Sequence, residues 1–247
     1  MFVAASTHCF HNQSFDDACH RIVDLEYDKV ELWFDEQSGQ LKPSEVAADP
    51  EQFVSRYQET TRLTPVAISL EHDVDLPTFT GLSKLAKLLQ VMQITVPASP
   101  LGTPFNSEID RLRAFLRVAG QDGVRVSIKT KTGLLTEDPD TAVELCQSVP
   151  GLGLTLDPSY FICGPHHDQP FDRVYPHVYH VQLRDTTPEQ LQVQIGLGVI
   201  DYSRLISKLR RVGYNRALSV ELLPAGDADG DRALEMRKLR MLLDSLL

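Results

Sequence analysis

Short apolar segments rich in β-branched residues recur eight times along the chain. Several of them are apolar without interruption, which is typical of parallel strands that are covered on both faces. The pattern therefore predicts eight strands, at residues 2–6, 29–34, 65–70, 92–98, 124–128, 152–156, 178–183 and 217–222.

Helix signals lie between these segments. Ser14 stands three residues before Asp17, and Asp49 and Asp138 each precede a proline, as capping residues do at the start of a helix. Apolar residues at helical spacing predict further helices over residues 106–119, 201–212 and 231–247.

The alternation of strands and helices indicates the fold class. Eight strands and roughly eight helices in 247 residues give about 31 residues per unit, the spacing of a (β/α)₈ barrel. No linker or low-complexity stretch marks a boundary, so we expect a single-domain TIM barrel over residues 1–247. A doubly wound open sheet is the alternative, but no Gly-x-Gly-x-x-Gly follows the first strand and no Walker motif occurs.

Composition narrows the class of partner. The chain has 24 Lys and Arg against 34 Asp and Glu, a formal net charge of −10. Because binding to a phosphate backbone needs a basic surface, we expect no nucleic-acid partner. No stretch approaches the length of a membrane span, and the N-terminus lacks a signal-peptide pattern. Four cysteines without a Cys-x-x-Cys pair favour reduced thiols, so we expect a cytoplasmic protein with no membrane partner.

Charged residues at the ends of the predicted strands mark the candidate site. A TIM barrel carries its active site at these ends. A charge embedded in an apolar strand is costly unless it is paired, bound to a metal or facing a wet pocket. Lys129, Asp157 and Glu221 fit this description best, and we expect them to approach one another and to form the catalytic group.

A substrate-binding set surrounds this group. His180, Gln182 and Arg184 alternate along the seventh strand and share one face, which we interpret as the mouth of the barrel lumen. With polar residues at other strand ends, the predicted set is His180, Gln182, Arg184, His72, His8, Glu31 and Tyr160.

Three segments carry a family resemblance. They are VRVSIKTKTGLLTEDPDTAVELCQSVPGLGLTLDPSYF, then HVQLRD, which is similar to an HxHxxD strand, and GLGVIDYSRLISKLRRVGYNRALSVEL near the end. In these segments, and more weakly along the whole chain, the sequence resembles the xylose isomerase-like sugar isomerases and epimerases, which are TIM barrels. The resemblance implies proton transfer next to the carbonyl of a small sugar or hydroxy-carbonyl compound. It also implies a homodimer as the expected assembly.

The same resemblance bears on a metal. Family members usually bind one divalent ion, often Mn²⁺ or Mg²⁺, through Glu, Asp, His and Glu at the ends of strands five to eight. The matching residues here are Lys129, Asp157, Gln182 and Glu221. Asp157, Gln182 and Glu221 would be the ligands of a retained metal, because oxygen donors suit a hard cation. Lys129 replaces a ligand carboxylate with a positive charge, so the expected cofactor is one divalent metal or none.

Three interpretations of Lys129 remain open at this point. Its ammonium replaces the metal and bridges Asp157 and Glu221, or a metal binds despite it, or the alignment is out of register. Three functions remain open as well. Glu221 acts as the general base while Lys129 or a metal stabilises an enediolate; Lys129 forms a Schiff base, as in lyases; or the barrel is a non-catalytic binding protein whose three charges form only a structural network.

A DNA-repair role like that of endonuclease IV, which shares the fold, is disfavoured. That enzyme needs a dense cluster of histidines and carboxylates for zinc, and Tyr160, Asp201 and Tyr202 stand where histidines would be needed.

Overall fold

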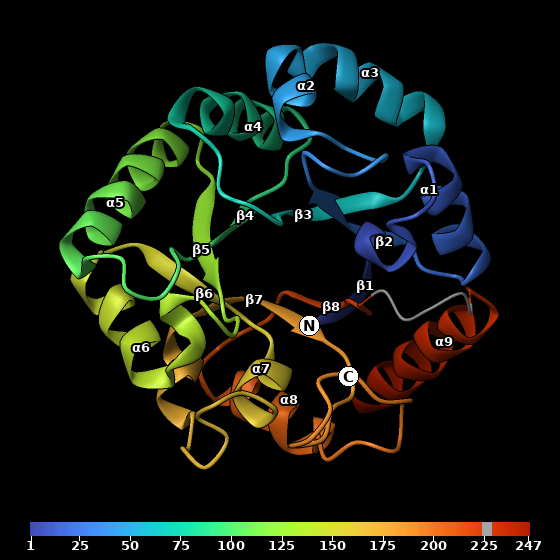
Figure 1. Ribbon diagram of the computed structural model, residues 1–247. Coiled ribbons are helices and arrows are strands. Elements are labelled where there is room, and N and C mark those ends of the chain that lie inside the picture. The colour runs from blue at the N-terminus through green and yellow to red at the C-terminus, as the bar shows by residue number, and fades with distance from the viewer. Residues whose placement is uncertain (224–228) are drawn as a thin grey trace.

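Eight parallel strands close into a barrel in chain order, with β1 paired to both β2 and β8 (Figure 1). The computed structural model describes residues 1–223 and 229–247, apart from the side chains of 229–231. The predicted TIM barrel is confirmed and the open sheet is excluded. The strands are β1 (Phe2–Ser6), β2 (Lys29–Phe34), β3 (Thr64–Leu70), β4 (Gln93–Pro97), β5 (Arg125–Lys129), β6 (Leu152–Leu156), β7 (Val178–Leu183) and β8 (Ala217–Val220).

The helices form a ring around the barrel (Figure 1). The expected caps are present: Ser14 accepts a hydrogen bond from the amide of Asp17, and Asp49 and Asp138 cap the helices that begin at Pro50 and Pro139. The helices are η1 (Thr7–Phe10), α1 (Phe15–Asp24), α2 (Pro43–Ala48), α3 (Pro50–Thr60), α4 (Leu76–Leu88), α5 (Phe105–Gln121), η2 (Leu135–Glu137), α6 (Pro139–Ser148), α7 (Pro158–Ile162), η3 (Asp172–His177), α8 (Tyr202–Arg211) and α9 (Asp229–Leu246).

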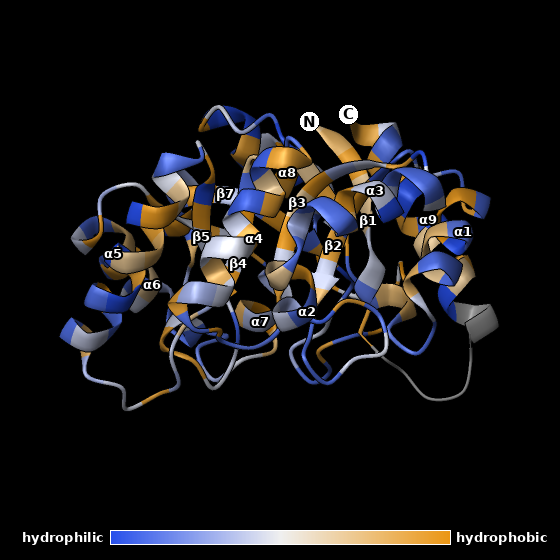
Figure 2. Ribbon diagram, turned by 90° about the horizontal axis from the view of Figure 1, so that it is seen from above, coloured by the Kyte–Doolittle hydropathy of each residue, from blue (hydrophilic) through white to orange (hydrophobic). Residues whose placement is uncertain are grey.

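The two ends of the barrel differ in character. Both termini lie on one side, and the loops that follow the strands lie on the other side (Figure 2). This second side, the mouth, receives the residues at the ends of the strands. β8 ends at Val220, two residues earlier than expected, so Glu221 comes directly after the strand instead of lying within it.

The barrel interior is polar, although TIM barrels usually fill it with branched aliphatic side chains. Thr95 and Thr155 belong to β4 and β6, which are not neighbours, and their hydroxyl oxygens are 2.7 Å apart. Ser127 of β5 lies between them and bonds to Thr155 at 2.6 Å. Across the lumen, Gln182 of β7 donates to Glu31 of β2 at 2.5 Å. The aliphatic strand residues therefore pack outward against the helices, and hydrogen bonds hold the centre.

One helix–helix contact depends on a glycine. α4 approaches α2 at Gly81, where an added Cβ would lie 2.4 Å from the backbone oxygen of Ala47. Gly120 in α5 has nothing within 4 Å of the same position. The two helical glycines therefore differ in the space that a methyl group would find.

We expect Gly81→Ala to destabilise the protein by about 1–3 kcal/mol, because the methyl group must push α4 away from α2. Gly120→Ala is the matched control, and it should be neutral or stabilise by up to about 1 kcal/mol through helix propensity. Equilibrium unfolding in urea measures both. Equal effects of the two substitutions would show that the close approach of α2 and α4 does not constrain the fold.

Candidate active site

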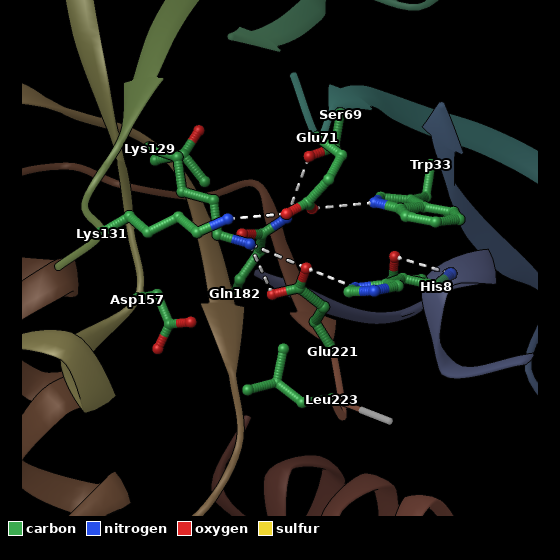
Figure 3. Close-up of polar contacts among 12 residues, drawn as sticks. His8, Trp33, Ser69, Glu71, Lys129, Lys131, Asp157, Gln182, Glu221 and Leu223 are labelled. Carbon is green, nitrogen blue, oxygen red and sulfur yellow. Dashed lines mark hydrogen bonds and ion pairs between the residues drawn. The ribbon is translucent and has the colours of Figure 1, made fainter. Parts of the chain in front are cut away.

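A buried ion pair lies at the mouth of the barrel. Lys129 ends β5 and Glu221 follows β8, and the Lys129 Nζ lies 2.8 and 2.9 Å from the two carboxylate oxygens of Glu221 (Figure 3). The exposed fractions of the two side chains are 7% and 0%. The structure thus brings together two of the three residues that were predicted to form the catalytic group.

The cation that joins the two carboxylates is Arg184, the residue after β7. Its Nη2 lies 2.6 Å from Glu221 Oε2 and 2.7 Å from Asp157 Oδ2, the second contact being an ion pair without hydrogen-bond alignment. Its Nε also donates to the backbone oxygen of Glu221 at 3.1 Å. Lys129 forms no ion pair with Asp157, so the expectation that Lys129 bridges both carboxylates is wrong. Its ammonium is engaged by Glu221, and the longer, forked guanidinium makes the bridge.

Asp157 is held in place by the segment that directly follows β6. It caps α7, and its Oδ1 accepts hydrogen bonds from the amide and the hydroxyl of Ser159 at 3.1 and 2.5 Å. The ring of Tyr160, on the same short helix, lies 5.4 Å from the Arg184 guanidinium carbon. Tyr160 therefore packs against Arg184, which is another member of the predicted substrate-binding set.

His8 completes what we call the inner row: His8, Glu221 and Lys129. The Nδ1 of His8 lies 3.1 Å from Glu221 Oε1, opposite the ammonium of Lys129. The imidazole stacks on the indole of Trp33, with ring centroids 4.3 Å apart and planes 13° from parallel. An aromatic ring, a carboxylate and an ammonium thus follow one another across the mouth.

An outer row of the same composition runs beside it: Trp33, Glu71 and Lys131 (Figure 3). Trp33 Nε1 donates to Glu71 Oε2 at 3.2 Å, and Lys131 Nζ lies 2.6 Å from Glu71 Oε1. The side chains of Lys131 and Glu71 are 31% and 20% exposed, so this row is closer to solvent than the inner row.

None of the outer-row residues was predicted as a site residue. Their spacing in the sequence could have identified them. Trp33, Glu71 and Lys131 each stand two positions after a residue whose side chain points into the lumen or belongs to the inner row. Those earlier residues are Glu31, Ser69 and Lys129, in the same order. A single Lys or Glu at a strand end looks like half of a surface pair, and only the structure shows that they meet.

The neighbouring charges and the burial of the side chains at the mouth determine which of these side chains are ionised. Burial alone would raise the pKa of Glu221, but the positive charges of Lys129 and Arg184 hold that pKa well below its ordinary value. Burial works to lower the pKa of Lys129, yet the charge of Glu221 raises it above the ordinary value. Asp157 differs, because burial outweighs the nearby cations and raises its pKa. At neutral pH the inner row therefore holds a carboxylate and an ammonium.

Three residues of the predicted substrate-binding set lie below the inner row, inside the barrel. Glu31 pairs with His180 and accepts a hydrogen bond from Gln182, which is also 3.4 Å from Ser69 Oγ. They are buried and bind one another. His72 stands apart from the site: its side chain is 60% exposed and pairs with Asp35 at 3.0 Å.

The donor set at the mouth does not fit a divalent metal. Of the three ligands that the resemblance implied, Gln182 is held by Glu31 through its Nε2, and its Oε1 has no hydrogen-bond partner among the described residues. Asp157 and Glu221 already hold two buried cations. A divalent ion added beside Lys129 and Arg184 would meet strong repulsion in a medium of low dielectric constant. Within residues 1–223 and 229–247, no three His, Cys, Asp or Glu side chains gather in a way that could hold a metal.

The inner row should matter for stability. Lys129→Met leaves Glu221 buried without its main cation, and breaking a buried pair in this way costs about 3–5 kcal/mol. Lys131→Met is the matched control, since its pair with Glu71 is partly exposed and contributes about 1 kcal/mol or less. Urea unfolding of the two variants measures the difference. Similar small losses would mean that Glu221 does not depend on Lys129.

Many solved structures share this fold. A xylose isomerase-like TIM barrel protein from Mycobacterium smegmatis, in complex with magnesium, has a TM-score of 0.77 at 16% identity, over 99% of this chain and 97% of that one. D-psicose 3-epimerase with D-tagatose, from Clostridium cellulolyticum H10, has 0.74 at 12%, over 100% and 99%. The probable 3-DHS dehydratase AsbF of Bacillus anthracis has 0.73 at 17%, over 97% and 98%. At these identities the likeness concerns the fold.

Sequence comparison is more specific about the family. No curated protein matches the chain. In the described part of the chain, no helix is both long and apolar enough to cross a membrane. The model of the xylose isomerase-like TIM barrel family matches residues 19–242, nearly the whole chain. The chain therefore belongs to the xylose isomerase-like TIM barrel family.

Proposed function

We propose that this protein isomerises or epimerises a small sugar or related hydroxy-carbonyl compound by moving a proton next to the carbonyl group, without a metal ion. The observation that carries the proposal is the ammonium of Lys129, buried at the mouth and held by both oxygens of Glu221. Sugar epimerases are among the proteins of the same fold, including the D-psicose 3-epimerase that was solved with D-tagatose.

Lys129 takes the electrophilic role. Removing a proton next to a carbonyl leaves negative charge on the carbonyl oxygen, and a fixed positive charge beside that oxygen stabilises the transition state. Such a charge acts more strongly in a buried site than in water. Lys129 is suited to this role because its side chain keeps 7% of its surface exposed, whereas Arg184 is fully enclosed and occupied by two carboxylates.

Glu221 takes the role of the base, and substrate binding makes it a stronger one. A substrate oxygen that accepts a hydrogen bond from Lys129 draws the ammonium away from the carboxylate. Glu221 then loses the cation that does most to lower its pKa. Its basicity rises while the substrate carbon lies beside it. The carboxylate removes the proton from that carbon and becomes a carboxylic acid. Return of this proton to the neighbouring carbon of the enediolate gives the isomer, and delivery of a proton from solvent to the opposite face of the original carbon gives the epimer.

The geometry disfavours the Schiff-base alternative. A lysine must be unprotonated to attack a carbonyl. Glu221 keeps Lys129 protonated and engages it through both oxygens. A non-catalytic binding protein is the second candidate, favoured by the full mutual compensation of charges in the inner row.

We expect the protein, treated with EDTA, to exchange the hydrogen next to the carbonyl of at least one of D-tagatose, D-psicose and L-ribulose for deuterium in D₂O. Mass spectrometry measures the rate. Lys129→Met and Glu221→Gln should each lower it by about 100- to 1,000-fold, the usual effect of removing one group that stabilises an oxyanion. Lys84→Met, at an exposed pair with Glu51, is the matched control and should leave the rate unchanged.

Each alternative has its own outcome. Exchange that appears only after Mn²⁺ or Mg²⁺ is added would mean that a metal binds despite Lys129. Calorimetric binding of a sugar without any exchange would indicate a binding protein. A borohydride-trapped adduct on Lys129 would indicate a lyase.

A further inference from the structure

A cavity lies at the end of the barrel opposite the mouth. Its volume is about 390 Å³, within the usual range for small-ligand sites. Its lining includes Phe2, Gln93 and Arg125, the first residues of β1, β4 and β5, together with Met92, Tyr179 and Arg216. Because strands begin at this end, the cavity is separate from the site of Lys129 and Glu221.

Two arginines of this cavity lack an acidic partner. The guanidinium carbons of Arg125 and Arg216 lie 5.7 and 5.5 Å from the ring centre of Tyr179, and Arg216 donates to the Tyr179 backbone oxygen at 3.2 Å. Within the described residues, neither forms an ion pair with a carboxylate. Burial, and then the positive charge of Arg125, lower the pKa of Arg216. Two uncompensated neighbouring cations are unexpected in a chain with a net charge of −10.

Local features of β6 and β7 determine the position of Tyr179. The pairing of β6 with β7 shifts between Leu154 and Thr155, so that Tyr179 is an extra residue in β7. Such a bulge redirects a side chain. On β6, a Cβ added to Gly153 would lie 2.2 Å from the tyrosine ring, so only glycine leaves the ring its place. Two local features thus hold Tyr179 where both arginines contact it.

Gln93, which also lines this cavity, carries an unsatisfied acceptor. The residue is 5% exposed, and its Nε2 donates to Ile94 O at 3.0 Å and to Ser127 Oγ at 2.5 Å. Its Oε1 is buried and has no hydrogen-bond partner among the described residues. An unpaired buried acceptor is costly, and a hydroxyl group from a ligand would satisfy it.

We propose that this cavity binds a small hydroxylated organic anion, whose carboxylate or phosphate lies against Arg125 and Arg216 and whose hydroxyl donates to Gln93. Guanidinium groups recognise both kinds of oxyanion through paired hydrogen bonds. Phe2 and Met92 supply an apolar wall for the carbon skeleton. The proposal does not depend on the reaction at the mouth. A purely structural role, in which the arginines only seal the barrel on Tyr179, is the competing explanation.

Isothermal titration calorimetry with sn-glycerol 3-phosphate and with D-glycerate tests the proposal. We expect saturable binding of at least one probe, and the tighter one identifies the preferred oxyanion. Arg125→Gln and Arg216→Gln should each weaken binding at least tenfold. Arg113→Gln, an exposed arginine on α5, is the matched control and should leave binding unchanged. Lys131→Met should also leave it unchanged, because the mouth is at the other end.

Several outcomes would overturn the proposal. Wild-type protein that binds neither probe saturably would leave the arginines a sealing role. Binding that survives both arginine substitutions but is lost in Lys131→Met would place the anion at the mouth. If the arginine variants do not fold, amide shifts of the ¹⁵N-labelled wild-type protein decide. Probe binding must then move the signals of Gly153 and Asn215, and shifts confined to residues at the mouth would contradict the site.

Discussion

The carboxylate of Glu221 is the centre on which the mouth of this barrel depends. It is fully buried, and three basic side chains from three other strand ends contact it: Lys129, Arg184 and His8. A buried charge is stable only when it is surrounded in this way. The ends of β1, β5, β7 and β8 are consequently tied to one point, and Arg184 extends the tie to Asp157 after β6. The geometry that a catalytic group would need is thus also what keeps this end of the barrel together.

The polar lumen beneath this centre explains why Gln182 does not turn toward it. Glu31 projects into the barrel from β2 and takes hydrogen bonds from Gln182 and His180 of β7. The amide of Gln182 is therefore committed to the interior. The other two implied ligands, Asp157 and Glu221, are held by the buried cations Lys129 and Arg184, so fixed charges occupy the place at the mouth where the resemblance implied a metal.

The sequence predicted the architecture well and the site in part. The eight strands were readable because strands covered on both faces give uninterrupted apolar runs, and the caps at Ser14, Asp49 and Asp138 were readable because capping is local. The residues at the strand ends followed from the barrel itself. Which cation reaches which carboxylate did not follow, because it depends on distances across the mouth. The orientation of Gln182 likewise depends on Glu31, 151 positions away in sequence. The outer row was missed because each member is unremarkable alone.

Trp33 is the only tryptophan in the chain, and this gives its position a practical meaning. Its ring lies on His8 and its Nε1 bonds to Glu71, so it contacts both rows at the mouth. Tryptophan fluorescence of this protein therefore originates from one place, next to the groups that a substrate would displace. No tryptophan lines the cavity at the opposite end of the barrel. The fluorescence of Trp33 should therefore report on the mouth of the barrel.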